Sequence, residues 1–481
     1  MNGQEFQALL PLLILAGGAT LMMLQIAFAR GLRLTTAFAL VILLLAALSV
    51  IPAGTDTPLA VTPLLMADRL GLVFCALFCG AGAVTVLLSA DYLKHRGDEP
   101  EEYFLLLLLS VLGACVLAYS VHVASLLLGL ELMSIALYAL IAYPDKSIAP
   151  LEASIKYLVL SGAASATALF GFALLYAATG SLSFQGIGDQ LGLIEGSGAM
   201  LFVAAAMIVA GLGFKLSMVP FHLWTPDVYD GAPSPVTGFL ASVSKAAVFF
   251  VLLRLFLNAD LFRYHILVEL LGLMAIFSML AGNFLALLQT NIKRMLAFSS
   301  IAHMGYLLVI FMAAVDISNR ALATEAAVFY LIAYTVTTLA AFGLLSLISS
   351  TGGERERVTL RDVSGLFWRQ PLAAGLLLTA LLSLAGIPLT AGFIAKFYIV
   401  SAAAGGSNWI LLASLVIGSG IGIYYYLRVV FCMTQRVEEQ DTGPIIPAGV
   451  GVRVVSLVLI AGILLLGLLP QPLLEYLRSI L

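Results

Sequence analysis

Apolar stretches of 18 or more residues recur along the whole 481-residue sequence, and they restrict the possible fold more than any other feature. A helix of that length crosses roughly 30 Å of hydrocarbon while satisfying its own backbone hydrogen bonds. Hydrophobic residues make up 62% of the chain and charged residues only 10%, whereas a soluble domain needs roughly 25% charged residues. We therefore expect an all-α polytopic membrane protein.

The apolar segments predict about 14 transmembrane helices, with boundaries good to a few residues. The first segment lacks a basic leader region and a small-residue cleavage site, so it is expected to be a retained helix and not a signal peptide. In chain order the segments are 5–28, 34–52, 71–92, 102–119, 122–143, 153–178, 198–219, 234–257, 264–288, 296–314, 322–349, 371–401, 408–432 and 451–475.

Basic residues gather on one side of the predicted membrane. With the N-terminus outside, the cytoplasmic loops carry fourteen Lys and Arg residues and the outer loops carry four. Positive charge favours the cytoplasmic side, so we predict a multi-pass bacterial inner-membrane protein with both termini in the periplasm. Arg254 and Arg428 lie near segment ends, where a long side chain can reach the surface, whereas Lys215, Lys245 and Lys396 lie too deep to do so.

Ionisable residues inside the apolar segments need a reason, because a charge at mid-bilayer costs ~2.5–3.5 kcal/mol on insertion scales. Glu131 lies near the middle of the fifth segment, Lys215 lies five residues before Pro220, and Lys245 lies in the eighth segment. Burial disfavours a charged amine and a nearby carboxylate restores it, so a lysine whose partner moves is a protonation switch. The alternative interpretation is a static ion pair that pins two helices together.

Two more residues extend this pattern. Lys396 follows Pro388, which stands near two glycines and predicts a broken helix, tolerated only where protein or water surrounds it. His303 can relay protons at physiological pH, although a lone membrane histidine can also be a packed, hydrogen-bonded side chain. Ser299, Ser300 and Tyr306 lie beside it in the sequence and can extend a hydrogen-bonded chain.

Other polar residues have weaker interpretations. His222, Asp227 and Tyr229 form a polar cytoplasmic-side loop that is either a proton uptake point or a structured turn. The four cysteines lie in apolar stretches without a nearby histidine or acid, so they are expected to be packing residues and not metal ligands. The sequence has no basic tract, and nucleic acid is not an expected partner.

The order of these residues indicates an internal repeat. A helix with Glu131 or His303 precedes, by two helices, a broken helix with Lys215 or Lys396. A repeat of five helices has an odd number of crossings, so its second copy must be inverted, as in many transporters. Against a simple mapping, Gly-Phe-Leu-Ala before Lys245 is similar to Gly-Phe-Ile-Ala before Lys396, although those two helices would not correspond.

Residues 211–245, with Lys-Leu-Ser-x-Val-Pro-Phe-His-Leu-Trp-Thr-Pro-Asp-Val-Tyr, resemble the antiporter-like membrane subunits of respiratory complex I, the proton-pumping NADH:quinone oxidoreductase. Gln-Thr-Asn-Ile-Lys-Arg at 289–294 and Ser-Leu-Ala-Gly-Ile-Pro at 383–388 do so too, and the resemblance covers essentially the whole chain. Within that family the chain is most similar to the subunit N type, which has fourteen helices and a lysine matching Lys396. The L type has a long C-terminal lateral helix, and the M type has a glutamate at that position.

The resemblance implies three N-terminal helices (1–98), two inverted five-helix repeats (99–260 and 261–436) and a last helix (437–481). It implies a pair matching Glu131 and Lys215, a connecting lysine matching Lys245, a central relay matching His303 and an exit-side lysine matching Lys396. It also implies that NADH, flavin, iron–sulfur clusters and quinone bind other subunits, with no cofactor or metal on this chain. The expected partners are other membrane subunits of the complex, especially a neighbouring antiporter-like subunit and small membrane subunits.

The resulting hypothesis is a translocase subunit that couples quinone reduction elsewhere to proton transfer across the membrane. The nearest alternative is a subunit of a stand-alone multi-subunit cation/proton antiporter. A haem- or quinone-bearing oxidoreductase would need two facing histidines at one depth, but His95, His122, His222 and His265 lie at predicted helix ends or in loops. A purely structural scaffold would not explain three lysines at mid-membrane.

Overall fold

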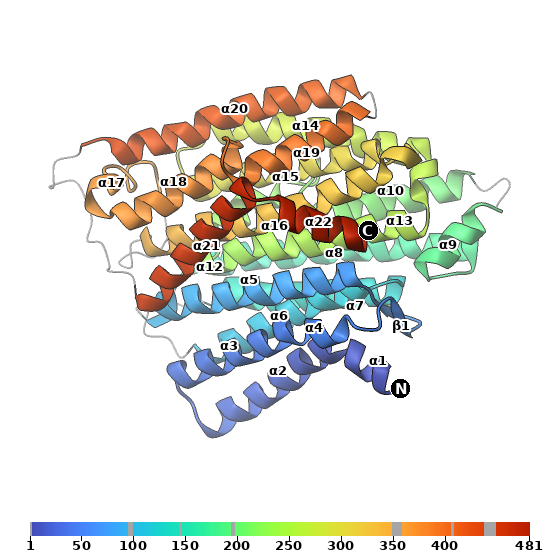
Figure 1. Ribbon diagram of the computed structural model, residues 1–481, viewed down its shortest axis with the longest axis horizontal. Helices are drawn as coiled ribbons and strands as arrows, with labels where there is room; N and C mark the ends of the chain where they lie inside the picture. Colours follow the sequence, from blue (N-terminus) through green and yellow to red (C-terminus); the bar gives the residue numbers. More distant parts are fainter. Residues whose placement is uncertain are drawn as a thin grey trace.

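The computed structural model describes residues 2–94, 100–143, 147–193, 198–348, 358–405, 408–436 and 449–481. Helices in these ranges lie side by side in one bundle, from the N-terminal α2 and α3 at one edge to α14 and α20 at the other (Figure 1). Thirteen helices of the described chain are long and apolar enough to cross a membrane. The predicted all-α polytopic membrane fold is therefore confirmed. The two inverted repeats and the domain boundaries stay predictions.

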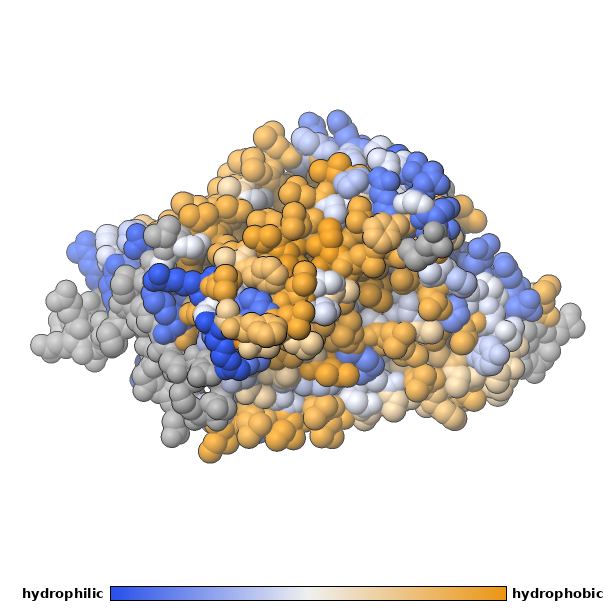
Figure 2. Space-filling view, turned by 90° about the horizontal axis from the view of Figure 1, so that it is seen from below, coloured by the Kyte–Doolittle hydropathy of each residue, from blue (hydrophilic) through white to orange (hydrophobic). Residues whose placement is uncertain are grey.

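The face seen in Figure 2 has hydrophobic side chains over its middle and hydrophilic side chains gathered towards its ends. This is the pattern of a bundle whose flanks meet lipid and whose ends meet water. The burial of individual helices differs widely. Over an apolar stretch of 18 residues, the buried share is 100% in the segment Ser234–Asn258 and 94% in the helix Ile292–Ala313, but only 22% in the helix Ile148–Thr179. The interior of the bundle is therefore formed by a few central helices.

The elements of the first half follow the predicted segments closely. Residues 59–67, which lie between two predicted segments, form a small antiparallel hairpin, and the connection after residue 179 contains a short helix. The bounds are α1 Gly3–Ala8, α2 Leu10–Phe28, α3 Leu32–Leu48, α4 Val50–Ala53, β1 Leu59–Thr62, β2 Leu65–Ala67, α5 Arg69–Lys94, α6 Glu101–Tyr119, α7 Val123–Ala142, α8 Ile148–Thr179 and α9 Phe184–Leu191.

The second half contains the interruptions. The bounds are α10 Gly198–Lys215, α11 Trp224–Gly231, α12 Ser234–Phe239, a π-helix Leu240–Ser244, α13 Lys245–Asn258, a 3₁₀ turn Leu261–Arg263, α14 His265–Leu287, α15 Ile292–Ala313, α16 Ile317–Ile348, α17 Leu366–Arg369, α18 Pro371–Ala385, α19 Ala391–Gly405, α20 Trp409–Thr434, α21 Val450–Leu468 and α22 Gln471–Ile480. The predicted segment 371–401 is two helices, as its central proline indicated. The segment 451–475 also divides, at Leu469 and Pro470.

Two expectations from the sequence were wrong. Arg254 does not reach the surface: it is 5% exposed, its guanidinium donates to Asp68 at 2.7 Å, and it lies over the Phe250 ring. The Asp68 carboxylate, from the connection between β2 and α5, makes this burial possible because it supplies the charge partner that lipid cannot. Residues Trp224–Gly231, expected to be a loop, form the helix α11.

Candidate functional site

The first buried lysine ends a helix. Lys215 is the last residue of α10 and is 4% exposed. The chain then turns through Ser217, whose φ is 60°, and the indole nitrogen of Trp224 donates to the freed carbonyl of Phe214 at 2.9 Å. The sequence placed Pro220 just beyond this point, where a helix cannot continue. The predicted interruption of the seventh segment is confirmed.

The Lys215 amine is held by hydroxyl groups. Its Nζ donates to Ser134 Oγ on α7 at 2.8 Å and to Ser161 Oγ on α8 at 2.6 Å. Glu131 is farther away, with 3.9 Å between Lys215 Nζ and Glu131 Oε1, and that carboxylate accepts from Ser165 at 2.5 Å. The Glu131 side chain is 37% exposed on the flank of the bundle, whereas the Lys215 side chain is 3% exposed. Glu131 and Lys215 therefore meet at the boundary between interior and flank.

The second buried lysine follows a π-helix. The turn Leu240–Ser244 precedes Lys245, which is 1% exposed and donates from Nζ to Ser300 Oγ on α15 at 2.7 Å. Ser300 also shares a 2.6 Å hydrogen bond with Tyr334 of α16. Nζ lies 5.6 Å from the centroid of the Tyr229 ring, a favourable position for a cation. Single π-turns inside α-helices are frequent at functional sites, and this one adjoins Lys245.

His303 lies between aromatic hydroxyls at the centre of the bundle. Its Nδ1 is 2.6 Å from the hydroxyl of Tyr330 on α16, and its Nε2 is 3.4 Å from that of Tyr426 on α20. Ser299 is hydrogen-bonded to the same Tyr426 hydroxyl. A side chain with two ring nitrogens, each facing a hydroxyl, can accept a proton on one side and release one on the other.

The break between α18 and α19 holds the third lysine. Gly386 has a φ of 82°, which favours glycine, and a Cβ there would lie 2.8 Å from Lys396 Cδ, so any other residue would displace that side chain. Lys396 donates from Nζ to the carbonyl of Ala385 at 2.9 Å, which is a carbonyl freed by the end of α18. Its amine also lies 5.2 Å from the centroid of the Tyr306 ring. The predicted break in the twelfth segment is confirmed, and the Lys396 amine is hydrogen-bonded to the backbone at that break.

A small cavity lies between the contacts of Lys245 and those of Lys396. It has a volume of about 10 Å³, close to the minimum for one water molecule. His303, Tyr334 and Lys396 all line it. The structure therefore places the Tyr334 hydroxyl, which is linked to Lys245 through Ser300, around one space with His303 and Lys396. Aromatic rings lie between this cavity and Lys215 with its serine partners: Trp224 stacks on Tyr157 and lies edge-on to Tyr229.

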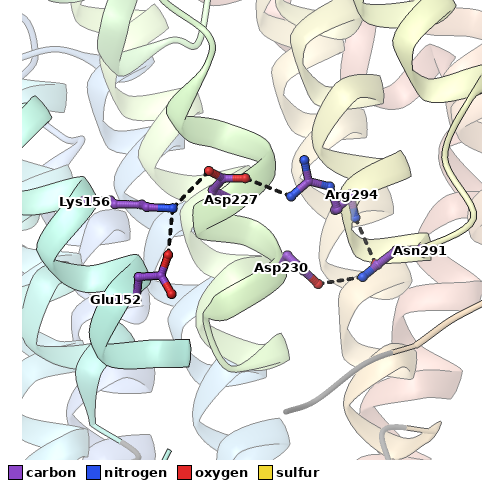
Figure 3. A network of polar contacts seen from close by, with 6 residues as sticks. All are labelled: Glu152, Lys156, Asp227, Asp230, Asn291 and Arg294. Carbon is purple, nitrogen blue, oxygen red and sulfur yellow. Dashed lines mark hydrogen bonds and ion pairs between the residues drawn. The ribbon is translucent and has the colours of Figure 1, made fainter. Parts of the chain in front are cut away.

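An ion-pair network links the helices α8, α11 and α15 (Figure 3). Asp227 on α11 is bound by Arg294 of α15 at 2.8 Å and by Lys156 of α8 at 3.3 Å, and Asn291 donates to Asp230 at 2.6 Å. Burial alone would raise the pKa of Asp227, but the hydrogen bonds from Arg294 and Lys156 outweigh it and lower the pKa below its usual value. This network favours the structured-turn interpretation of the segment.

The other two residues of that segment point elsewhere. Tyr229 is fully buried beneath the Lys245 amine, and His222 is 8% exposed with an Nδ1 that has no hydrogen-bond partner within the described chain. Burial lowers the pKa of His222, which keeps the ring neutral at physiological pH. The histidines His122 and His265 lie at the start of α7 and α14, and His95 lies outside the described residues.

Several residues that contact the buried lysines, Glu131 or His303 were not predicted from the sequence. They are mostly hydroxyl side chains in apolar segments, and some recur at a spacing of four residues that places them on one helix face. They are Ser134, Ser161, Ser165, Tyr330, Tyr334 and Tyr426. The four-residue spacing of Ser161 with Ser165, and of Tyr330 with Tyr334, is the feature of the sequence that could have indicated a polar helix face. In the described residues no group of three or more His, Cys, Asp or Glu could hold a metal ion.

Comparison with known proteins bears on the identity of this bundle. The family described as "NADH:quinone oxidoreductase/Mrp antiporter, TM" matches residues 120–422. NADH-quinone oxidoreductase subunit N of Methylococcus capsulatus is 50% identical over 478 residues, covering 99% of this chain and 95% of the relative. The protein of the same name from Ectopseudomonas mendocina is 46% identical over 489 residues, covering 99% and 97%.

Solved structures show the same likeness. A chain of respiratory complex I from Thermus thermophilus superimposes with a TM-score of 0.82 at 34% identity, covering 97% of this chain and 99% of that one. A chain of the archaeal membrane-bound sulfane sulfur reductase gives 0.85 at 25% identity, covering 99% and 96%. A chain of the Mrp complex from Dietzia gives 0.80 at 21% identity, covering 98% and 96%, and so shares the fold alone. The resemblance to the subunit N type is confirmed, and this chain belongs to the membrane-subunit family of NADH:quinone oxidoreductases and Mrp antiporters.

Proposed function

We propose that this chain is the N subunit of a proton-pumping NADH:quinone oxidoreductase and that it moves protons through Lys215, Lys245, His303 and Lys396. The observation that carries the proposal is the way the three lysines are held. Each amine is buried or half-buried and is bound by hydroxyl groups, a carbonyl or an aromatic face. Neutral partners of this kind tolerate both the charged and the neutral amine.

The static alternative would look different. The described residues contain tight pairs of that kind, among them Arg254 with Asp68 at 2.7 Å and Arg294 with Asp227 at 2.8 Å. Lys215 and Glu131 are instead 3.9 Å apart, and each binds serine hydroxyls at closer range. A loose pair leaves the lysine's proton free to move when the carboxylate moves. The geometry therefore supports a protonation switch over a static ion pair that holds two helices together.

In this proposal protons enter from the cytoplasm near Glu131 and Lys215, pass Lys245 and His303, and leave to the periplasm by way of Lys396. Coupling arises when a charge on a neighbouring subunit draws Glu131 away from Lys215, because the amine then loses its only nearby anion within the described chain and releases its proton. The exposed position of Glu131 on the flank makes it available to such a neighbour. The energy comes from quinone reduction elsewhere in the complex.

The remaining parts of the assignment rest on the relatives. NADH, flavin, iron–sulfur clusters and quinone are proposed to bind other subunits, and this chain to have no redox role. Its partners are proposed to be other membrane subunits, chiefly an antiporter-like neighbour and small membrane subunits. The proposed location is the bacterial inner membrane, with both termini in the periplasm.

The test replaces Lys215 or Lys245 by alanine in the assembled complex and measures proton translocation and quinone reductase activity together in proteoliposomes. Lys94, an exposed lysine at the end of α5, gives the matched control Lys94→Ala. We expect both buried-lysine variants to lose proton translocation and the control to keep it. Wild-type rates for assembled Lys215→Ala and Lys245→Ala would refute the proposal. Sodium-dependent antiport that is indifferent to NADH would assign the chain to a stand-alone antiporter instead.

A further inference from the structure

A second acidic residue lies inside the bundle and takes no part in the pathway described above. Glu325 of α16 is 5% exposed. Its carboxylate accepts from Arg478 Nε through both oxygens, each at 3.0 Å. Arg478 comes from α22, the last helix of the chain, and its side chain is 58% exposed. The exposed Arg478 side chain thus covers the buried Glu325 carboxylate on its solvent side.

The position of Glu325 along α16 places it between the pathway and one end of the bundle. Tyr330, which binds His303, lies five residues deeper, a rise of about 7.5 Å. Towards the other side, Asn319 near the start of α16 donates to the carbonyl of Ala402 near the end of α19 at 2.8 Å. Because these helix ends meet on the predicted periplasmic side, Glu325 lies on the outward route from the His303 and Lys396 cavity.

Arg478 also contacts the helix that carries Lys396. Its Nη2 is 3.4 Å from the hydroxyl of Tyr398, two residues beyond Lys396 on α19, and the Tyr398 ring stacks on Phe329 of α16. A hydroxyl, a carboxylate and a guanidinium from three helices therefore meet about half a helical turn beyond Lys396 along α19, towards the predicted periplasmic end. α22 lies across α16 in Figure 1, over this point.

The helix α22 does not need the ion pair to stay in place. Leu474 and Leu477 on its inner face are 4% and 0% exposed. At the other end of the connection, a side chain at Gly467 would collide with the backbone of Leu389 and Thr390, so the end of α21 touches the α18–α19 break. An ion pair whose arginine is 58% exposed adds little to such docking, whereas its buried carboxylate is costly and needs a reason.

We propose that Glu325 is the outlet acid of the Lys396 pathway and that Arg478 is a positioning residue that keeps it closed between turnovers. A proton leaves the Lys396 ammonium, passes to the Glu325 carboxylate, and is released to the periplasmic water when Arg478 reclaims its partner. The lysine becomes neutral and then is reprotonated from His303. Contact between the α21 end and the break gives α22 a direct connection to movements at Lys396. This inference rests on the proposed function and names the last group of its relay.

The test uses the complete complex in proteoliposomes with three variants, Glu325→Gln, Arg478→Gln and the double variant, beside Glu475→Gln as a matched control from the exposed face of α22. We expect Glu325→Gln to abolish translocation through this subunit and Arg478→Gln to retain it. Without turnover, Arg478→Gln should raise passive proton leak about two- to fivefold, the population change for losing one half-exposed ion pair. The double variant should return the leak to the wild-type level because the acid is gone.

A purely structural pair predicts instead that both single variants, once assembled, pump and leak protons as the Glu475→Gln control does. Equal translocation and equal leak in the two single variants would therefore overturn the inference, as would wild-type pumping by Glu325→Gln. Lys215→Ala and Lys245→Ala, run in the same assay, separate the two levels of the proposal. If they lose translocation while Glu325→Gln keeps it, the outlet assignment alone fails. If they too pump normally, the proposed function fails.

Discussion

Ser161 offers the sharpest test of how Lys215 handles its proton. The Ser161 hydroxyl accepts from Lys215 Nζ at 2.6 Å and from the Tyr138 hydroxyl at 2.6 Å. Ser161→Ala removes both bonds without changing any charge. A hydrogen bond to a charged group contributes about 1.5–3 kcal/mol and one to a neutral group about 0.5–1.5 kcal/mol, so the loss falls mainly on the protonated amine. The difference, roughly 1 kcal/mol, corresponds to about fivefold in the population of the charged form.

The assay is proton translocation per NADH oxidised, measured beside assembly of the purified complex. We expect Ser161→Ala to assemble and to lower translocation, because the amine holds its proton less firmly while Ser134 and Glu131 remain. Thr167 on the same helix provides the control: its hydroxyl donates only to the Ala163 carbonyl of its own helix among described partners, and Thr167→Ala removes the same group. Equal translocation by the two variants would show that the Ser161 bond does not set the proton affinity of Lys215.

Two further perturbations test other parts of the structure. Asp227→Asn should lower the thermal stability of the subunit at neutral pH; because the native pKa of Asp227 is depressed, its contribution is present above the usual carboxyl range and is lost as the pH falls through that native pKa. Unfolding temperatures that differ equally at neutral and strongly acidic pH would contradict this. Gly386→Ala should cost about 1–2 kcal/mol for its left-handed backbone and displace Lys396, so translocation should fall, whereas Gly375→Ala, with open space around it, should be neutral in the same assay. An active, stable Gly386→Ala variant would show that neither the left-handed backbone at residue 386 nor the contact with Lys396 needs glycine.

The membrane fold, the interrupted seventh and twelfth segments and the buried lysines could all be predicted from the sequence. The reason is that insertion into lipid is governed by the sum of local transfer energies, and a helix is broken by its own proline and glycine residues. Pro388 with Gly386 predicted the break that holds Lys396, and the depth of Lys215 and Lys245 followed from the length of their segments.

Partners across helices were decided only by the tertiary structure. Ser161 lies 54 residues from Lys215, and Arg478 lies 153 residues from Glu325. Arg254 was expected at the surface because its partner Asp68, 186 residues away in the sequence, could not be identified without the structure. Which hydroxyl faces which amine depends on the rotation and packing of each helix against its neighbours. In an apolar segment every face is hydrophobic, so no periodic pattern records that rotation, and only the assembled bundle determines it.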